Sequence, residues 1–149
     1  MIKSFKISVS QHTLNNIYSK VKNYPWNLIQ NVNGWKYGTN YNYLKNISKY
    51  WASKYNWKKY EKKINSFSNY ETKVDGLNIH FIKEKSKNPK SRPLLLLHGW
   101  PGSVIEFLDI IPKLAHPEKF GGKKDDGFDV IVPSLPGFGF STPIKKAMG

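Results

Sequence analysis

Apolar residues in the first part of the chain recur at intervals of three and four positions, which places them on one face of a helix. The first such stripe consists of Leu14, Ile17, Tyr18 and Val21. Ser10 precedes this stripe and is a residue type that caps helix N-termini. Pro25 follows the stripe and disfavours further helix. The pattern predicts a helix between these two residues.

Two further stretches show helical spacing. They are Leu44, Ile47 and Trp51, in a helix starting near Asn42, and Trp57, Tyr60 and Ile64, in a helix over 57–64. Large aromatic residues are more often packed in a core than used as site residues. We therefore interpret these aromatics as core residues.

Other stretches show the alternation or the short apolar runs of strands. Phe5, Ile7 and Val9 alternate with polar residues and predict a short strand over 5–9. Asp75–Gly76 is a hairpin signal, so residues 72–83 predict two antiparallel strands. His80 lies on the second of these strands, and we interpret it as structural. The apolar segment 129–132 predicts a further strand, closed by Pro133.

The segment 94–97 is a run of four leucines, which favours a strand buried on both faces, although periodicity alone also allows a buried helix. A turn with two glycines follows over 98–102, and the segment 103–106 has the pattern of a capping box. Ile105, Leu108 and Ile111 then continue at helical spacing. The order from residue 77 onward, strand, strand, helix and strand, predicts the opening of an α/β sheet.

The turn over 98–102 offers a candidate site. Gly99 and Gly102 leave room for a ligand close to the backbone, and free N–H groups before a helix can hold an oxyanion. The alternative is a plain strand-to-helix connection, which is common in such units. Geometry alone does not separate the two.

Two long motifs carry a family resemblance, and they are His98-Gly99-Trp100-Pro101-Gly102-Ser103 and Pro133-Ser134-Leu135-Pro136-Gly137-Phe138-Gly139-Phe140-Ser141. Upstream matches lie at 5–9, 34–38, 50–51 and 75–81. Together they resemble the N-terminal portion of microsomal-type epoxide hydrolases, an α/β-hydrolase family. The resemblance implies an α/β fold, truncated, with an N-terminal helical extension over 1–88 and the incomplete start of the hydrolase core over 89–149.

The resemblance also implies a chemistry. In the family, an Asp carboxylate attacks the epoxide, two lid tyrosines protonate its oxygen, and a His activates the water that cleaves the resulting ester to give a vicinal diol. The backbone N–H of Trp100 would supply one oxyanion-hole donor, supported by the loop residues His98, Gly99, Pro101 and Gly102. The Trp100 side chain would help to wall the pocket, and the bond before Pro101 would be cis.

No residue of this sequence lies where the family has its nucleophile, its lid tyrosines or its catalytic His. The five aspartates, none of which follows a strand in an elbow, are Asp75, Asp109, Asp125, Asp126 and Asp129. We therefore expect the nucleophile, the lid tyrosines and the catalytic His to lie outside this chain. This would be the N-terminal part of a longer hydrolase and inactive alone. Its partners would be a small apolar epoxide and the remainder of the hydrolase core.

Composition narrows the alternatives. The chain has no Cys, and its four His show no ligand spacing, so we expect no metal and no cofactor. The net charge is +14, but Arg92 is the one Arg among 24 basic residues, and the lysines are scattered. Nucleic-acid readers favour Arg forks, which argues against that partner. Without a long apolar run or a signal peptide, the expected location is cytoplasmic, with peripheral membrane association left open.

The sequence leaves three other functions open, namely another α/β-hydrolase, a non-catalytic binding module and a basic nucleic-acid binder. The matches over 5–81 favour the epoxide hydrolases over the first of these. One departure from the family pattern lies at Asn56-Trp57-Lys58, where the family usually has Asp-Trp-Arg. Loss of a bidentate Arg contact there would affect local stability more than activity.

Overall fold

The computed structural model describes residues 1–31 and 34–144. Its contacts divide the chain into two compact units, a helical unit over 8–61 and a sheet unit formed by 1–7 together with 62–149. The predicted boundary between 88 and 89 falls inside the sheet unit and stays a prediction.

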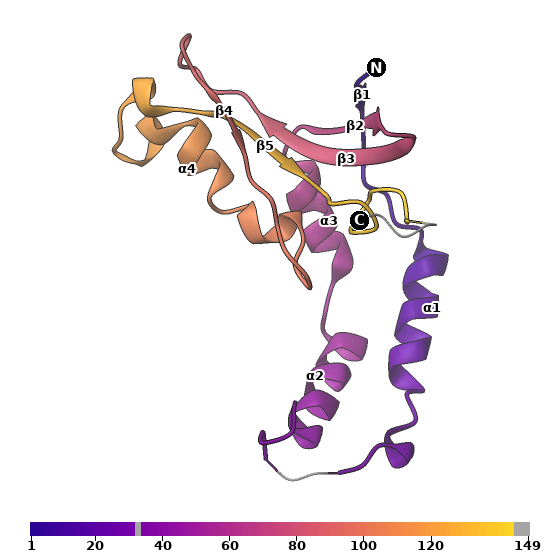
Figure 1. Ribbon diagram of the computed structural model, residues 1–149. Helices are drawn as coiled ribbons and strands as arrows, with labels where there is room; N and C mark the ends of the chain where they lie inside the picture. Colours follow the sequence, from indigo (N-terminus) through magenta and orange to yellow (C-terminus); the bar gives the residue numbers. More distant parts are fainter. Residues whose placement is uncertain (32–33, 145–149) are drawn as a thin grey trace. The chain divides into compact units, whose positions relative to one another are not determined.

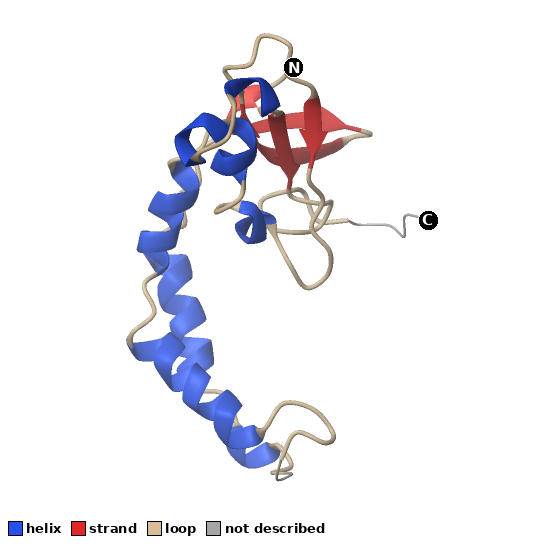
Figure 2. Ribbon diagram, turned by 90° about the vertical axis from the view of Figure 1, so that its left-hand side faces the viewer, coloured by secondary structure: helices blue, strands red, loops and turns tan. Residues whose placement is uncertain are grey.

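The helical unit contains two helices that run side by side in opposite directions (Figures 1 and 2). Helix α1 (Gln11–Lys22) begins where the prediction put it, because the Ser10 hydroxyl accepts the Thr13 N–H at 3.0 Å. Helix α2 (Tyr41–Ser53) is capped by Asn40, whose side chain accepts the Tyr43 N–H at 3.0 Å. A short 3₁₀ turn over Trp26–Leu28 lies between them.

The predicted apolar face of α2 is not buried. Leu44, Ile47 and Trp51 are each at least two-fifths exposed, and Tyr60 is 39% exposed, so the interpretation of the aromatics as core residues is wrong for Trp51 and Tyr60. The half-buried positions of α2 are instead Tyr41, Lys45, Ser48 and Ala52. In α1, Leu14 alone is fully buried.

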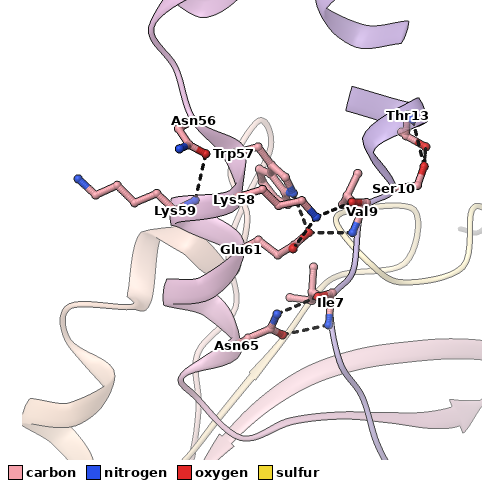
Figure 3. A network of polar contacts seen from close by, with 10 residues as sticks. All are labelled: Ile7, Val9, Ser10, Thr13, Asn56, Trp57, Lys58, Lys59, Glu61 and Asn65. Carbon is pink, nitrogen blue, oxygen red and sulfur yellow. Dashed lines mark hydrogen bonds and ion pairs between the residues drawn. The ribbon is translucent and has the colours of Figure 1, made fainter. Parts of the chain in front are cut away.

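Helix α3 (Trp57–Asn65) confirms the third predicted helix. At its start a cluster of polar contacts surrounds the Glu61 carboxylate (Figure 3). This carboxylate accepts the Val9 N–H at 2.7 Å, the Trp57 indole N–H at 3.0 Å and the Lys58 ammonium at 2.8 Å. The hydrogen bond from Lys58, followed by that from Val9, lowers the pKa of Glu61.

Within the described residues, five strands form one mixed sheet in the order β1-β2-β3-β5-β4. They are β1 (Lys3–Ser4), β2 (Asn69–Val74), β3 (Leu77–Glu84), β4 (Pro93–Leu95) and β5 (Asp129–Pro133). β4 and β5 pair in parallel, and the other three pairings are antiparallel. Asp75 and Gly76 both have positive φ, as a type I′ hairpin turn requires, which confirms the predicted hairpin.

Two strand predictions need correction. The strand expected over 5–9 does not form, and the strand lies just before it at Lys3–Ser4, because the backbone of Ile7 bonds to the Asn65 side chain instead of to a strand. The leucine run is not buried on both faces, since Leu95 and Leu97 are more than half exposed. The reason is that β4 lies at the edge of the described sheet and pairs with β5 alone.

The helix expected after the capping box is also interrupted. A 3₁₀ turn over Val104–Phe107 comes first, and helix α4 follows only at Ile111–Ala115. Pro112 explains the break, because it has no N–H to donate to the carbonyl of Leu108. Helix α4 packs against β3 and β5 (Figure 1), and two further 3₁₀ turns, Pro117–Phe120 and Lys124–Asp126, lead to β5.

The core of the sheet unit lies between the inner face of the sheet and the segment 104–115. Its fully or almost fully buried residues are Ile7, Ile64, Ile82, Val104, Leu108, Ile111, Ala115, Val130 and Val132. Burial alternates along β5, where the second and fourth residues point inward. This packing fixes the ends of β4 and β5, from which the candidate site loops emerge.

Candidate functional site

The loop over 98–103 leaves the end of β4. The Trp100–Pro101 peptide bond is cis, as the resemblance implied. The Gly102 N–H donates to the Gly99 carbonyl at 2.7 Å, which closes the turn. At Gly99 an added Cβ would meet no atom within 4 Å, so the backbone is open on that side.

Trp100 presents a free backbone donor. Among residues 1–31 and 34–144 no atom accepts a hydrogen bond from its N–H. Its side chain is 84% exposed and apolar. An unpaired N–H beside an open turn is the kind of group that binds an oxyanion.

The end of the loop differs from the expected capping box. The Ser103 hydroxyl accepts the Ile105 N–H at 3.4 Å, and the Glu106 N–H donates to the Ser103 carbonyl at 3.1 Å. No bond from the Glu106 side chain back to Ser103 occurs in the described ranges. The Glu106 carboxylate lies beside Gly102 instead, where an added Cβ would collide with it. The space at Gly102 is thus taken by a side chain and is not left for a ligand.

His98 joins the two motifs that carried the resemblance. Its ring is 4% exposed, and Nε2 accepts the backbone N–H of Leu135 at 3.1 Å. A backbone N–H can only donate, so Nε2 carries no proton and the neutral ring holds its proton on Nδ1. Nδ1 lies 3.3 Å from the Gly99 carbonyl, and the Phe138 ring packs edge-on at 5.3 Å. His98 therefore bonds both to its own turn and to the loop over 133–141.

A second buried histidine anchors the loop over 133–141. His80 is fully buried, with Nδ1 2.9 Å from the Ser134 hydroxyl and Nε2 3.0 Å from the Asn69 side-chain oxygen. Burial lowers the pKa of His80 to about 4. The sequence did not predict Ser134 and Asn69 as partners of His80, or Leu135 as the partner of His98. Residues that meet only in the folded structure have no regular spacing in the sequence.

The aspartates occupy structural positions. Asp75 lies in the hairpin turn, and Asp125 and Asp126 lie in a 3₁₀ turn. Asp109 accepts the Lys63 ammonium at 2.8 Å, which lowers the pKa of Asp109. Asp129 accepts hydrogen bonds from the Ser91 hydroxyl and the Ser86 N–H, and these bonds lower its pKa. None of them bonds to the loop over 98–103 within the described ranges.

Residues 1–31 and 34–144 contain neither a cluster of metal ligands nor a membrane-spanning helix. No group of His, Asp or Glu side chains there has an arrangement that could hold a metal ion. No helix in these ranges has both the length and the apolar character needed to cross a bilayer.

The sheet is mixed, and a glycine-containing turn follows its parallel strand β4. This arrangement is that of the alpha/beta hydrolase fold, and the sequence profile of that class of protein matches residues 92–147. A second profile, "Epoxide hydrolase N terminus", matches residues 2–107. The chain belongs to the epoxide hydrolase family.

Individual relatives agree. Epoxide hydrolase 1 of Oryctolagus cuniculus is 39% identical over 151 residues, which cover 97% of this chain and 33% of that protein. The crystal structure of juvenile hormone epoxide hydrolase from Bombyx mori matches with a TM-score of 0.82 and 38% identity, over 98% of this chain and 35% of that one. Aspergillus niger epoxide hydrolase matches with a TM-score of 0.76 and 28% identity, over 98% and 38% respectively. The chain therefore spans about a third of the length of the relatives it matches.

Proposed function

We propose that this chain forms the oxyanion side of an epoxide hydrolase active site, with the Trp100 N–H as one of two backbone donors. The observation that carries this proposal is that the Trp100 N–H has no acceptor among the described residues. It lies in a turn that His98 connects to the loop over 133–141 through the Leu135 N–H. When water attacks the ester carbonyl, negative charge develops on its oxygen, and a donor fixed beforehand stabilises that charge without reorganisation. His98, Gly99, Pro101 and Gly102 keep the donor in place.

The substrate is an apolar epoxide, and the product is the vicinal diol. An apolar pocket wall is consistent with the exposed indole of Trp100. The names of the Oryctolagus cuniculus and Bombyx mori relatives point to the same reaction class. The Asp nucleophile, the two lid tyrosines and the His that activates water come from the part of a complete hydrolase that corresponds to the other two thirds of these relatives.

A chimera tests the proposal. This chain replaces the matching third of Oryctolagus cuniculus Epoxide hydrolase 1, and conversion of an aryl epoxide to its diol is measured. The chimera should turn over the epoxide, whereas the 149-residue chain alone should show no conversion. A folded chimera without activity contradicts the proposal. Turnover by the chain alone contradicts the placement of the nucleophile.

The role of Trp100 is tested on its backbone atom. Incorporating the α-hydroxy analogue of tryptophan at 100 replaces the N–H by an ester oxygen. In the chimera we expect kcat to fall by about 10²–10³-fold, the usual effect of losing one oxyanion-hole donor. Trp100→Phe is the matched control, because it keeps the N–H and an aromatic wall, and kcat should stay within about threefold. Equal effects of both changes would exclude a backbone role.

A further inference from the structure

Two buried histidines hold consecutive residues of the loop over 133–141. His80, from the middle of β3, is bonded to the Ser134 side chain, and His98, from the loop after β4, is bonded to the Leu135 N–H. The relative exposures of the two histidines are 0% and 4%. The position of one short loop segment is thus fixed from two sides.

The hydrogen bonds around His80 have one consistent direction. The Asn69 amide nitrogen donates to the carbonyls of Ile64 and Phe67 at 2.9 and 2.8 Å, so its oxygen faces His80 and accepts from Nε2–H. Nδ1 then carries no proton and accepts from the Ser134 hydroxyl. His80 is neutral in this arrangement, which agrees with its lowered pKa.

The backbone of Ser134 is also held by hydrogen bonds. Its N–H donates to the His80 carbonyl at 2.9 Å, and its own carbonyl accepts from the Ser141 hydroxyl at 2.6 Å. The Ser141 hydroxyl in turn accepts the His80 N–H at 3.1 Å. Gly139, with φ of +52°, passes so close that an added Cβ would lie 2.8 Å from the Ser134 hydroxyl. Every polar atom of Ser134 is therefore tied to β3 or to its own loop.

We propose that His80 is a positioning residue for the oxyanion donor, acting on the Trp100 N–H through Ser134, Leu135 and His98. His80 fixes Ser134 against the sheet, Ser134 fixes the adjacent Leu135 N–H, and that N–H orients the His98 ring at the start of the turn that carries Trp100. We call this series the histidine relay. Its catalytic meaning rests on the proposed function, but its geometry does not.

The first experiment measures the geometry on the 149-residue chain by NMR. Scalar coupling across the hydrogen bond between the Leu135 amide nitrogen and His98 Nε2 reports directly on the bond that ends the histidine relay. We expect this coupling in the native chain and a clear decrease in Ser134→Ala. Ser86→Ala is the control, since Ser86 is likewise buried, at 7% exposure against 0% for Ser134, and its hydroxyl accepts one local bond, from Asn88 N–H at 3.0 Å. Coupling equal in both variants would overturn the proposal.

The second experiment separates positioning from bulk stability in the active chimera. His80→Leu removes both ring hydrogen bonds, whereas in His80→Asn an oxygen at the position of Nδ1 still accepts from Ser134. We expect kcat to fall by about tenfold in His80→Leu with KM within about twofold, and to be largely restored in His80→Asn. If His80→Leu does not fold, Ser134→Ala takes its place, with the same expected split.

The outcomes are distinguishable. Loss of coupling without any change in kcat overturns the catalytic role of His80, and an unchanged coupling overturns the relay itself. A chimera that is inactive with the native sequence overturns the proposed function, and with it the catalytic role of the relay. In that case the coupling still decides whether Ser134 holds Leu135.

Discussion

At the scale of single residues, His80 and Trp100 show opposite degrees of predictability. The role proposed for Trp100 follows from the family resemblance of the motif that contains it, in which neighbouring residues build the turn. For His80, the sequence predicts a structural residue on a strand, which its burial and hydrogen bonds agree with, but it does not predict the partners of the ring. Ser134 lies 54 positions away along the chain, and only the pairing of β3 with β5 brings the two residues together.

The neutral His80 makes stability depend on pH. In the unfolded chain its pKa is about 6.5, and in the folded chain about 4. Between these values the unfolded state binds more protons, so the free energy of unfolding falls as the pH falls from 6.5 to 4 and this loss is complete below 4. The contribution of His80 to this loss is about 3 kcal/mol at most.

Urea unfolding at a series of pH values measures this effect. His80→Asn is the control, because it keeps an acceptor for Ser134 but does not titrate. The difference between the two proteins removes the contributions of His12, His98, His116 and the carboxylates. A difference that stays constant between pH 6.5 and 4 would show that His80 is not held neutral.

At the scale of elements, the helices were predicted better at their beginnings than on their faces. Ser10 was identified as a cap from its position alone, because capping depends on residues three apart in the chain. The buried face of α2 was predicted wrongly, because the periodicity of a helix does not encode which elements cover it. Pro112 could have been recognised in advance as a break before α4, since the loss of its N–H is a local effect.

The start of α3 offers a matched pair of lysines. Lys58 donates to the Val9 carbonyl and to Glu61, whereas the side chain of Lys59 points away from this cluster (Figure 3). Lys58→Met and Lys59→Met change the net charge equally. We expect the first to lower the free energy of unfolding by about 1 kcal/mol and the second to change it by less than about 0.5 kcal/mol.

Urea unfolding followed by tryptophan fluorescence suits this comparison, because the Trp57 indole shares the Glu61 carboxylate with Lys58. Equal losses for both variants would mean that the net charge, and not the contacts of Lys58, determines stability here. The Lys that replaces the usual Arg of the family would then have no local role.

The edge position of β4 predicts association of the isolated chain. Leu97 is 57% exposed next to an unpaired strand edge, while Leu96 is half-buried and its N–H donates to the Ile131 carbonyl at 2.9 Å. Leu97→Lys should reduce concentration-dependent association and leave stability within about 0.5 kcal/mol. Leu96→Lys should destabilise the chain by about 1–3 kcal/mol. Light scattering and urea unfolding together check both, and association unchanged in Leu97→Lys would contradict the edge explanation.

At the scale of the whole molecule, the class of fold was predictable and the division into units was not. The α/β opening followed from the run of strands and turns, and the family from two motifs that the fold brings together through His98 and Leu135. The sheet unit, however, includes residues 1–7, which lie ahead of the helical unit in the sequence. A two-residue strand such as β1 is too short for its alternation to be recognised.

The contacts that tie the segment ahead of α1 to α3 have a consequence for the order of folding. Ile7 and Asn65 exchange two hydrogen bonds across a separation of 58 positions, and forming this closed loop costs on the order of 4 kcal/mol of chain entropy. Helices formed earlier within the loop shorten its flexible length, and each halving recovers about 0.6 kcal/mol. During synthesis β1 is made before the helical unit, and its partner strand β2 is made after it. β1 can therefore pair with β2 only after α1, α2 and α3 have been made.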